Sequence, residues 1–210
     1  MKVHEVARRL DPLFPALDEA DQRLSLAIYR KLARGAPVDL NDLFSELGID
    51  AAEGVRRMQP WPGVYYDSEQ RVIGYWGLSL APMRHRLRVG ARELYAWCAW
   101  DTLFLPAVLG TRLGVASSCQ ATGEAVRLAV DATGVESAEP PGVAVSFVVP
   151  DSEAVRADVI TSFCHYVHFF ASEKAAAPWL EKRREAFLLS LRDAFEVGRL
   201  LNRRRYGTAL

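Results

Sequence analysis

A change in the spacing of apolar residues near Pro60 constrains the fold of this chain most strongly. Before Pro60, apolar residues recur at helical intervals and predict short helices over residues 21–34, 39–47 and 51–58. After Pro60, short apolar runs are separated by Gly, Pro and polar turns, which is typical of strands. Half of the 210 residues are apolar, so the chain can bury a sizeable core. The sequence therefore predicts an α+β protein.

The first eighty residues are predicted to form a winged-helix-like module. Asp21 is expected to cap the first of its three helices. Two apolar and aromatic segments, Val64–Asp67 and Val72–Leu80, flank a polar turn and predict a β-hairpin. Residues 81–210 are expected to form a second domain, a mixed or antiparallel β-sheet with flanking helices.

The second domain is expected to contain both strands and helices. The predicted strands lie at residues 82–89, 115–118, 125–130 and 143–149. Helices are predicted over residues 91–109 and 179–202. Residues 203–210 are basic and are expected to fray from the last helix.

The charge balance argues against several classes of partner. The chain has 26 Lys and Arg against 26 Asp and Glu, and its first ninety residues have 13 against 12. The third predicted helix offers only Arg56 and Arg57 to DNA, so the first module is expected to pack or cover rather than to read DNA. No apolar run is long enough for a membrane span, and no leader pattern opens the chain. We therefore expect a soluble, cytoplasmic protein without a nucleic-acid or membrane partner.

Three cysteines, Cys98, Cys119 and Cys164, are the main candidates for chemistry. An odd count without an export signal favours reduced thiols over disulfides. The sequence has no Cys-x-x-Cys pair, so a zinc-finger type of site is not expected. Walker A, G-x-G-x-x-G, G-x-S-x-G and H-E-x-x-H motifs are also missing.

Cys98 and Asp101 form the most specific pair. On the predicted helix a thiol and a carboxylate three residues apart share one face. The surrounding aromatic residues and the lack of a local cation predict a raised pKa for Asp101, which could then hold or move a proton. Two thiols and one such carboxyl group suit a site that binds a soft metal and also protonates a bond made to that metal.

The other two cysteines leave alternatives open. Cys164 is followed by His165 and His168, and on a strand Cys164 and His168 would face the same side, so a Cys/His zinc site is one alternative. Cys119 precedes a turn at Gly123 and is either a third metal-binding thiol or a packed structural cysteine.

At these residues the chain resembles the organomercurial (alkylmercury) lyase family. The segments that carry the resemblance span about Val72 to Asn202: YAWCAWDTLFLPAVLG, SSCQATG, PPGVAVSFVVP and SFCHYVHFFAS. The resemblance implies that Cys98 and Cys164 are the two catalytic thiols, that Asp101 is the catalytic aspartate, and that all three contact mercury. It also implies that Cys119 is structural.

The implied function is protonolytic cleavage of carbon–mercury bonds to a hydrocarbon and Hg(II). The aromatic residues Tyr95, Trp97, Trp100 and Phe163 are expected to line a dry cavity for the organic group. The resemblance implies no cofactor, a need for low-molecular-weight thiols to release product, and a mercuric reductase as product acceptor. Two rival hypotheses are a winged-helix transcription regulator that responds to metals or thiol reagents and a lyase-like protein that binds soft metals without turnover.

Overall fold

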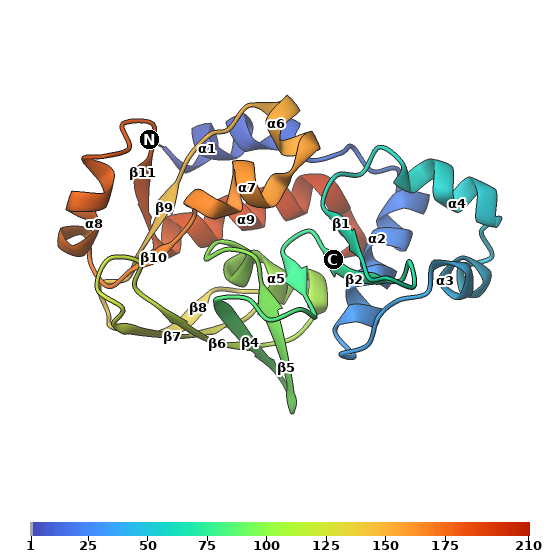
Figure 1. The fold of residues 1–210 in the computed structure, drawn as a ribbon, viewed down its shortest axis with the longest axis horizontal. Coiled ribbons are helices and arrows are strands. Elements are labelled where there is room, and N and C mark those ends of the chain that lie inside the picture. The colour runs from blue at the N-terminus through green and yellow to red at the C-terminus, as the bar shows by residue number, and fades with distance from the viewer. Residues whose placement is uncertain (1) are drawn as a thin grey trace.

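A computed structural model describes residues 2–210, and its strands form two β-sheets. Figure 1 shows strands β4 to β8 along the lower side of the molecule, with most of the helices above them and to the right. The helices, with 3₁₀ turns written η, are α1 Val3–Leu10, η1 Asp11–Leu13, α2 Glu19–Leu32, α3 Leu40–Leu47, α4 Ala51–Met58, α5 Asp101–Leu109, α6 Ser152–Ala157, α7 Val159–Ser162, η2 Cys164–Tyr166, α8 Glu173–Leu180, α9 Leu191–Tyr206 and η3 Gly207–Ala209. The strands are β1 Val64–Tyr66, β2 Val72–Tyr75, β3 Leu78–Ser79, β4 His85–Val89, β5 Arg92–Ala96, β6 Leu113–Ser118, β7 Ala125–Val130, β8 Val135–Glu139, β9 Ala144–Phe147, β10 Phe169–Phe170 and β11 Phe187–Ser190.

Aspartate caps explain where α2, α3 and α4 begin. The carboxylates of Asp18, Asp39 and Asp50 accept hydrogen bonds from backbone N–H groups in the first turns of these helices. The expectation that Asp21 caps the first helix is wrong, because α2 begins two residues earlier. The backbone N–H of Asp21 instead donates to the Asp18 side chain at 2.8 Å.

The larger sheet joins the two halves of the chain. Its eight strands follow the order β1-β2-β3-β5-β4-β6-β7-β8, and each neighbouring pair is antiparallel. The predicted α+β class is therefore confirmed. The three helices and the hairpin follow in the expected order, while the winged-helix-like designation stays a prediction. The domain boundary at residue 80 also stays a prediction, and β3 pairs with β5 across that position.

A second, three-stranded sheet and the long helix α9 complete the core. The strands follow the order β10-β9-β11. Helix α9 runs through the middle of the molecule and packs against both α1 and α5 (Figure 1). A hydrophobic cluster draws side chains from both halves of the chain, from Val6 to Tyr206. Within residues 2–210, no helix has both the length and the apolar character needed to cross a bilayer.

The helix predicted over residues 91–109 is correct only in its second half. Residues 92–96 form β5, which pairs with β4 from Arg92–Val89 to Ala96–His85. A short loop, residues 97–100, then leads into α5. The spacing of apolar residues fitted a helix, but pairing with β4 overrides that local preference.

The helix predicted over residues 179–202 is also wrong as a single element. Helix α8 ends at Leu180, and β11 intervenes before Ser190 caps α9 through the backbone N–H of Asp193. The expectation of a frayed basic tail is wrong as well, because α9 continues to Tyr206. The Tyr206 hydroxyl lies 2.8 Å from the Ser25 hydroxyl on α2, so a tertiary hydrogen bond holds the end of the helix.

Gly198 should be required where α9 crosses α5. A Cβ at this position would lie 2.7 Å from the Cβ of Phe104. Overpacking costs about 1–3 kcal/mol, and a Cβ–Cβ contact belongs in the upper part of this range because no rotamer change relieves it. After subtraction of a gain in helix propensity of about 1 kcal/mol, we expect Gly198→Ala to lower the free energy of unfolding by about 1–2 kcal/mol in urea titrations. Gly134→Ala is the control, since a methyl group at Gly134 would have no other atom within 4 Å, and equal stabilities of Gly198→Ala and the wild type would contradict this packing.

Candidate active site

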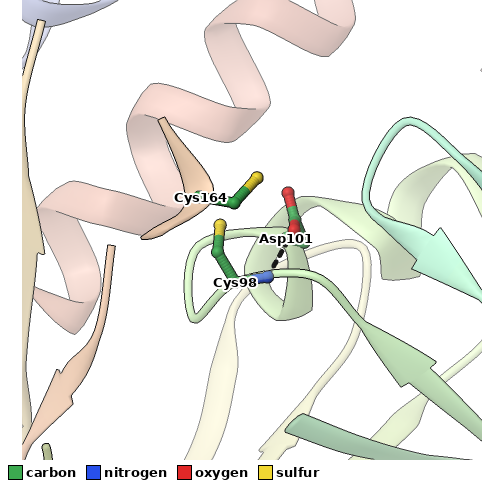
Figure 2. Close-up of side chains that lie close together, drawn as sticks. All are labelled: Cys98, Asp101 and Cys164. Carbon is green, nitrogen blue, oxygen red and sulfur yellow. Dashed lines mark hydrogen bonds between the residues drawn. The ribbon is translucent and has the colours of Figure 1, made fainter. Parts of the chain in front are cut away.

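Cys98 and Asp101 lie where the loop after β5 meets α5. The Cys98 backbone N–H donates a hydrogen bond of 2.7 Å to Oδ2 of Asp101, the first residue of the helix (Figure 2). The prediction that the two residues share one face of a helix is therefore wrong, because Cys98 lies in the loop before the helix. The carboxylate folds back over the loop instead, because a helix N-terminus attracts an acidic side chain and leaves nearby N–H groups unpaired.

Cys164 reaches the same place from a distant segment. It begins η2, which Phe163 separates from α7, so residues 159–170 do not form the single strand on which the Cys/His alternative depended. The Ala99 backbone N–H donates to the Val167 carbonyl at 3.2 Å and ties the two segments together. The two sulfurs and a carboxylate oxygen lie within 4.8 Å of one another. Figure 2 shows the three side chains gathered in one place. Residues 66 positions apart (164 − 98) thus form one cluster.

The cluster is enclosed by aromatic rings. Cys98, Asp101 and Cys164 are 0%, 4% and 5% exposed. Asp101 and Cys164 border a cavity of about 10 Å³, roughly the space of one water molecule. The cavity is lined by Phe14, Trp76, Gly77, Trp97, Trp100, Asp101, Phe104, Val159, Phe163 and Cys164.

The structure corrects the expected cavity lining in part. Trp97, Trp100 and Phe163 line the cavity as predicted, but Tyr95 does not. The Tyr95 hydroxyl donates instead to Glu93 at 2.8 Å, because alternate residues of β5 face opposite sides of the sheet. Phe14 and Trp76 were missed because they come from the first eighty residues, and no local pattern connects them with the cysteines.

Burial controls the proton affinity of the three groups. Burial raises the pKa of Asp101 to about 7, although hydrogen bonds from Cys98 lower it. Burial also raises the pKa of Cys98, followed by its hydrogen bond with Cys164 and the Asp101 charge. The hydrogen bond with Cys98 lowers the pKa of Cys164, but burial and the nearby Asp101 outweigh it, so the pKa of Cys164 is raised. Both thiols therefore keep their protons in the metal-free protein.

Gly77 leaves room for the Asp101 carboxyl group. Its φ of +93° lies in the region that favours glycine, and a Cβ would lie 2.7 Å from the Asp101 Cγ. The Gly77 carbonyl also accepts the backbone N–H of Trp97 at 3.0 Å, so the turn after β2 braces the loop that carries Cys98. Sequence reasoning missed Gly77, since a glycine between two strands is an ordinary turn signal.

The remaining candidates lie outside the cluster. His165 and His168 are not part of it within the described chain, and the rings of His168 and Trp179 pack edge to face. Cys119 is buried in a separate apolar group with Phe170 and Ala176. This position agrees with the structural alternative for Cys119.

Two thiols and a carboxyl group within joint reach of one atom define a centre suited to a soft metal such as mercury, with one donor able to carry a proton. Comparison with known proteins is consistent with this class. Residues 78–202 match the family model described as alkylmercury lyase.

Named relatives agree with the family model. The alkylmercury lyase of Staphylococcus epidermidis is 44% identical over 177 residues, covering 84% of this chain and 80% of that protein. The alkylmercury lyase of Bacillus cereus is 37% identical over 205 residues, covering 97% and 92%. The crystal structure of the mercury-bound form of MerB2 matches with a TM-score of 0.79 at 25% identity, covering 96% of this chain and 98% of that one. The chain belongs to the alkylmercury lyase family, and the resemblance seen in the sequence is confirmed.

Replacement of Asp101 by Asn should change how stability depends on pH. The pKa of Asp101 rises from 3.8 to about 7 on folding, so the folded protein holds this proton more tightly. The linked stability is full below the unfolded pKa and is lost as pH rises through the folded pKa. We expect wild-type stability, relative to Asp101→Asn, to fall between about pH 4 and pH 7 by up to ~4 kcal/mol. Urea unfolding of both mercury-free proteins at several pH values measures this difference, and a constant difference would count against a buried carboxyl group.

Proposed function

We propose that this protein cleaves the carbon–mercury bond of organomercurials and releases a hydrocarbon and Hg(II). The observation that carries the proposal is the buried cluster of Cys98, Asp101 and Cys164 in a chain of the alkylmercury lyase family. Each group has a distinct role. The two thiols bind mercury, and Asp101 moves a proton from sulfur to carbon.

The reaction balances with the protons that the two thiols carry. One thiol replaces the ligand already on mercury, and its proton leaves with that ligand. The second sulfur then binds mercury while its proton passes to Asp101. Asp101 returns this proton to the carbon as the carbon–mercury bond breaks, so its raised pKa of about 7 suits it to act first as base and then as acid. Mercury remains bound by two thiolates.

Thiolate binding is what makes the carbon basic enough to be protonated. Mercury(II) prefers sulfur to oxygen or nitrogen, and each thiolate adds electron density to the metal and to its attached carbon. The rings of Trp97, Trp100 and Phe163 keep water from the site, so the developing charges are not screened. The cavity of about 10 Å³ must open for an organic group to enter.

The chemistry requires no separate cofactor, because the protein supplies both sulfur ligands and the proton carrier. Two thiolates hold mercury tightly, so release requires a competing ligand of the same kind. We therefore propose a low-molecular-weight thiol as the agent of release, a mercuric reductase as the acceptor of Hg(II), and the cytoplasm as the compartment that supplies both.

Cys98→Ser and Cys164→Ser should each abolish cleavage. A hydroxyl group is a poor ligand for a soft metal, and loss of a ligand should cost at least about a hundredfold in rate. Release of benzene from phenylmercury in excess thiol measures the reaction by gas chromatography. Cys119→Ser is the matched control, since this change should reduce stability but keep the activity of the folded protein. An inactive, well-folded Cys119→Ser variant would show that its structural role is misassigned.

Asp101→Asn should separate mercury binding from cleavage. The amide can still accept the Cys98 N–H, but it can neither take nor return a proton. We expect mercury to bind through the two thiols while the single-turnover rate falls by roughly a hundredfold or more. Hydrocarbon release and mercury stoichiometry are measured on the same sample. Near-normal release would mean that another group supplies the proton, and binding without release by the wild type would identify a non-catalytic mercury-binding protein.

A further inference from the structure

Arg205 on α9 is a buried cation without an acidic partner. Arg205 is 5% exposed. Within residues 2–210, it takes part in no salt bridge. Its Nε and Nη2 atoms are buried and have no hydrogen-bond partner. Interactions with Tyr29, Tyr75 and Tyr206 favour the charge of Arg205. Buried N–H groups without acceptors still destabilise a protein, so the two open positions on this guanidinium require an explanation.

Aromatic rings compensate this charge only in part. The Cζ atom of Arg205 lies 4.9 Å from the ring centre of Phe14, 5.3 Å from that of Trp76 and 5.1 Å from that of Tyr206. These cation–π contacts stabilise the positive charge of the guanidinium. They cannot satisfy the N–H groups along its edge, because those groups need acceptors in the plane.

The guanidinium lies next to the cavity that Cys164 and Asp101 line. A narrow gap beside Arg205, too small for a water molecule, is lined by Phe14, Trp100 and Phe104, and the same three rings line that cavity. Phe14 lies between the two spaces and stacks on Trp76 with ring centres 4.7 Å apart. Phe14 belongs to the segment between η1 and α2, outside regular structure. It can therefore move with less disruption than Phe104, which lies on α5, or Trp100, whose Nε1–H donates to the Ala194 carbonyl.

We infer that Arg205 is a specificity-determining residue that binds an anionic substituent, a carboxylate, on the organic group of the substrate. This inference rests on the proposed cleavage of organomercurials. An aryl group that displaces Phe14 would extend from the thiols toward Arg205. Nε and Nη2 lie on the same edge of the guanidinium, and that edge pairs with both oxygens of a carboxylate.

The energetics favour a charged over a neutral substituent. Folding has already removed water from Arg205, so a carboxylate that enters the site gains a strong pair without a new desolvation cost for the arginine. A neutral substituent would leave both N–H groups unpaired. The preference should lie in KM, because the substituent is remote from the carbon–mercury bond.

The test compares substrates that differ at one position of the ring. 4-Carboxyphenylmercury, 4-methylphenylmercury and phenylmercury are cleaved in excess thiol, and kcat/KM is measured for each. We expect the wild type to favour the carboxylated substrate over the methylated one by about tenfold or more, the scale for a hydrogen bond to a charged group. Arg205→Met should remove this preference. Arg205→Lys should keep only part of it, since an ammonium group cannot pair side by side with both oxygens.

Arg203→Met is the matched control, because Arg203 is exposed on the same helix and the change in net charge is identical. It should leave the ratio between substrates unchanged. A wild type that shows no preference overturns the inference even if the Arg205 variants fail to fold. Equal losses on all substrates in Arg205→Met would also overturn it and make Arg205 a structural residue. A wild type that releases no hydrocarbon from phenylmercury contradicts the proposed function itself.

Discussion

The hydrogen bond from the Cys98 backbone N–H to the Asp101 carboxyl group organises the site on which this protein depends. The bond holds the carboxyl group of Asp101, the proposed proton carrier, beside the residue that carries the Cys98 thiol. Without it, the Asp101 side chain could rotate away from the loop. Gly77 supports the arrangement from one side, since any larger residue would occupy the place of the carboxyl group. The bond between Ala99 and Val167 supports it from the other side and brings the second thiol into reach. Three segments from different parts of the chain therefore meet at one small cluster.

Burial sets the proton affinities of the three groups in this cluster and also leaves nearby polar groups without partners. Removal from water raises the pKa of both thiols and of Asp101, so the metal-free centre keeps both thiol protons while Asp101 can gain or lose a proton near pH 7. A soft metal can displace the thiol protons because its bonds to sulfur are stronger than the hold of the thiols on their protons. Harder ions bind sulfur much more weakly and displace these protons less readily. The same dry surroundings leave Arg205 without an acceptor for its edge. A buried polar group without a partner in a folded protein requires an explanation, and here a ligand would supply the missing acceptor.

The first eighty residues take part in the site rather than standing apart from it. Phe14 and Trp76 close the cavity above the cysteines, and β3 extends the sheet that carries β5. This arrangement agrees with the near-neutral charge of the segment, which argued for a packing or covering role. The order of helices and hairpin was the basis for predicting a winged-helix-like module, and side chains from this part of the chain help to enclose a small cavity.

The sequence by itself determined the α+β class, the positions of α3 and α4, and the three residues of the candidate centre. These features depend on local rules, namely apolar spacing, glycine or proline after a helix, and a specific motif around Cys98, Asp101 and Cys164. Tertiary structure decided the rest. Pairing with β4 made a strand of residues 92–96, and β11 divided the predicted C-terminal helix, because hydrogen bonds between distant strands outweigh weak local preferences. The roles of Phe14, Gly77 and Arg205 were likewise hidden, since a cavity wall, a missing Cβ and an unpaired charge are defined by neighbours that lie far away in the chain.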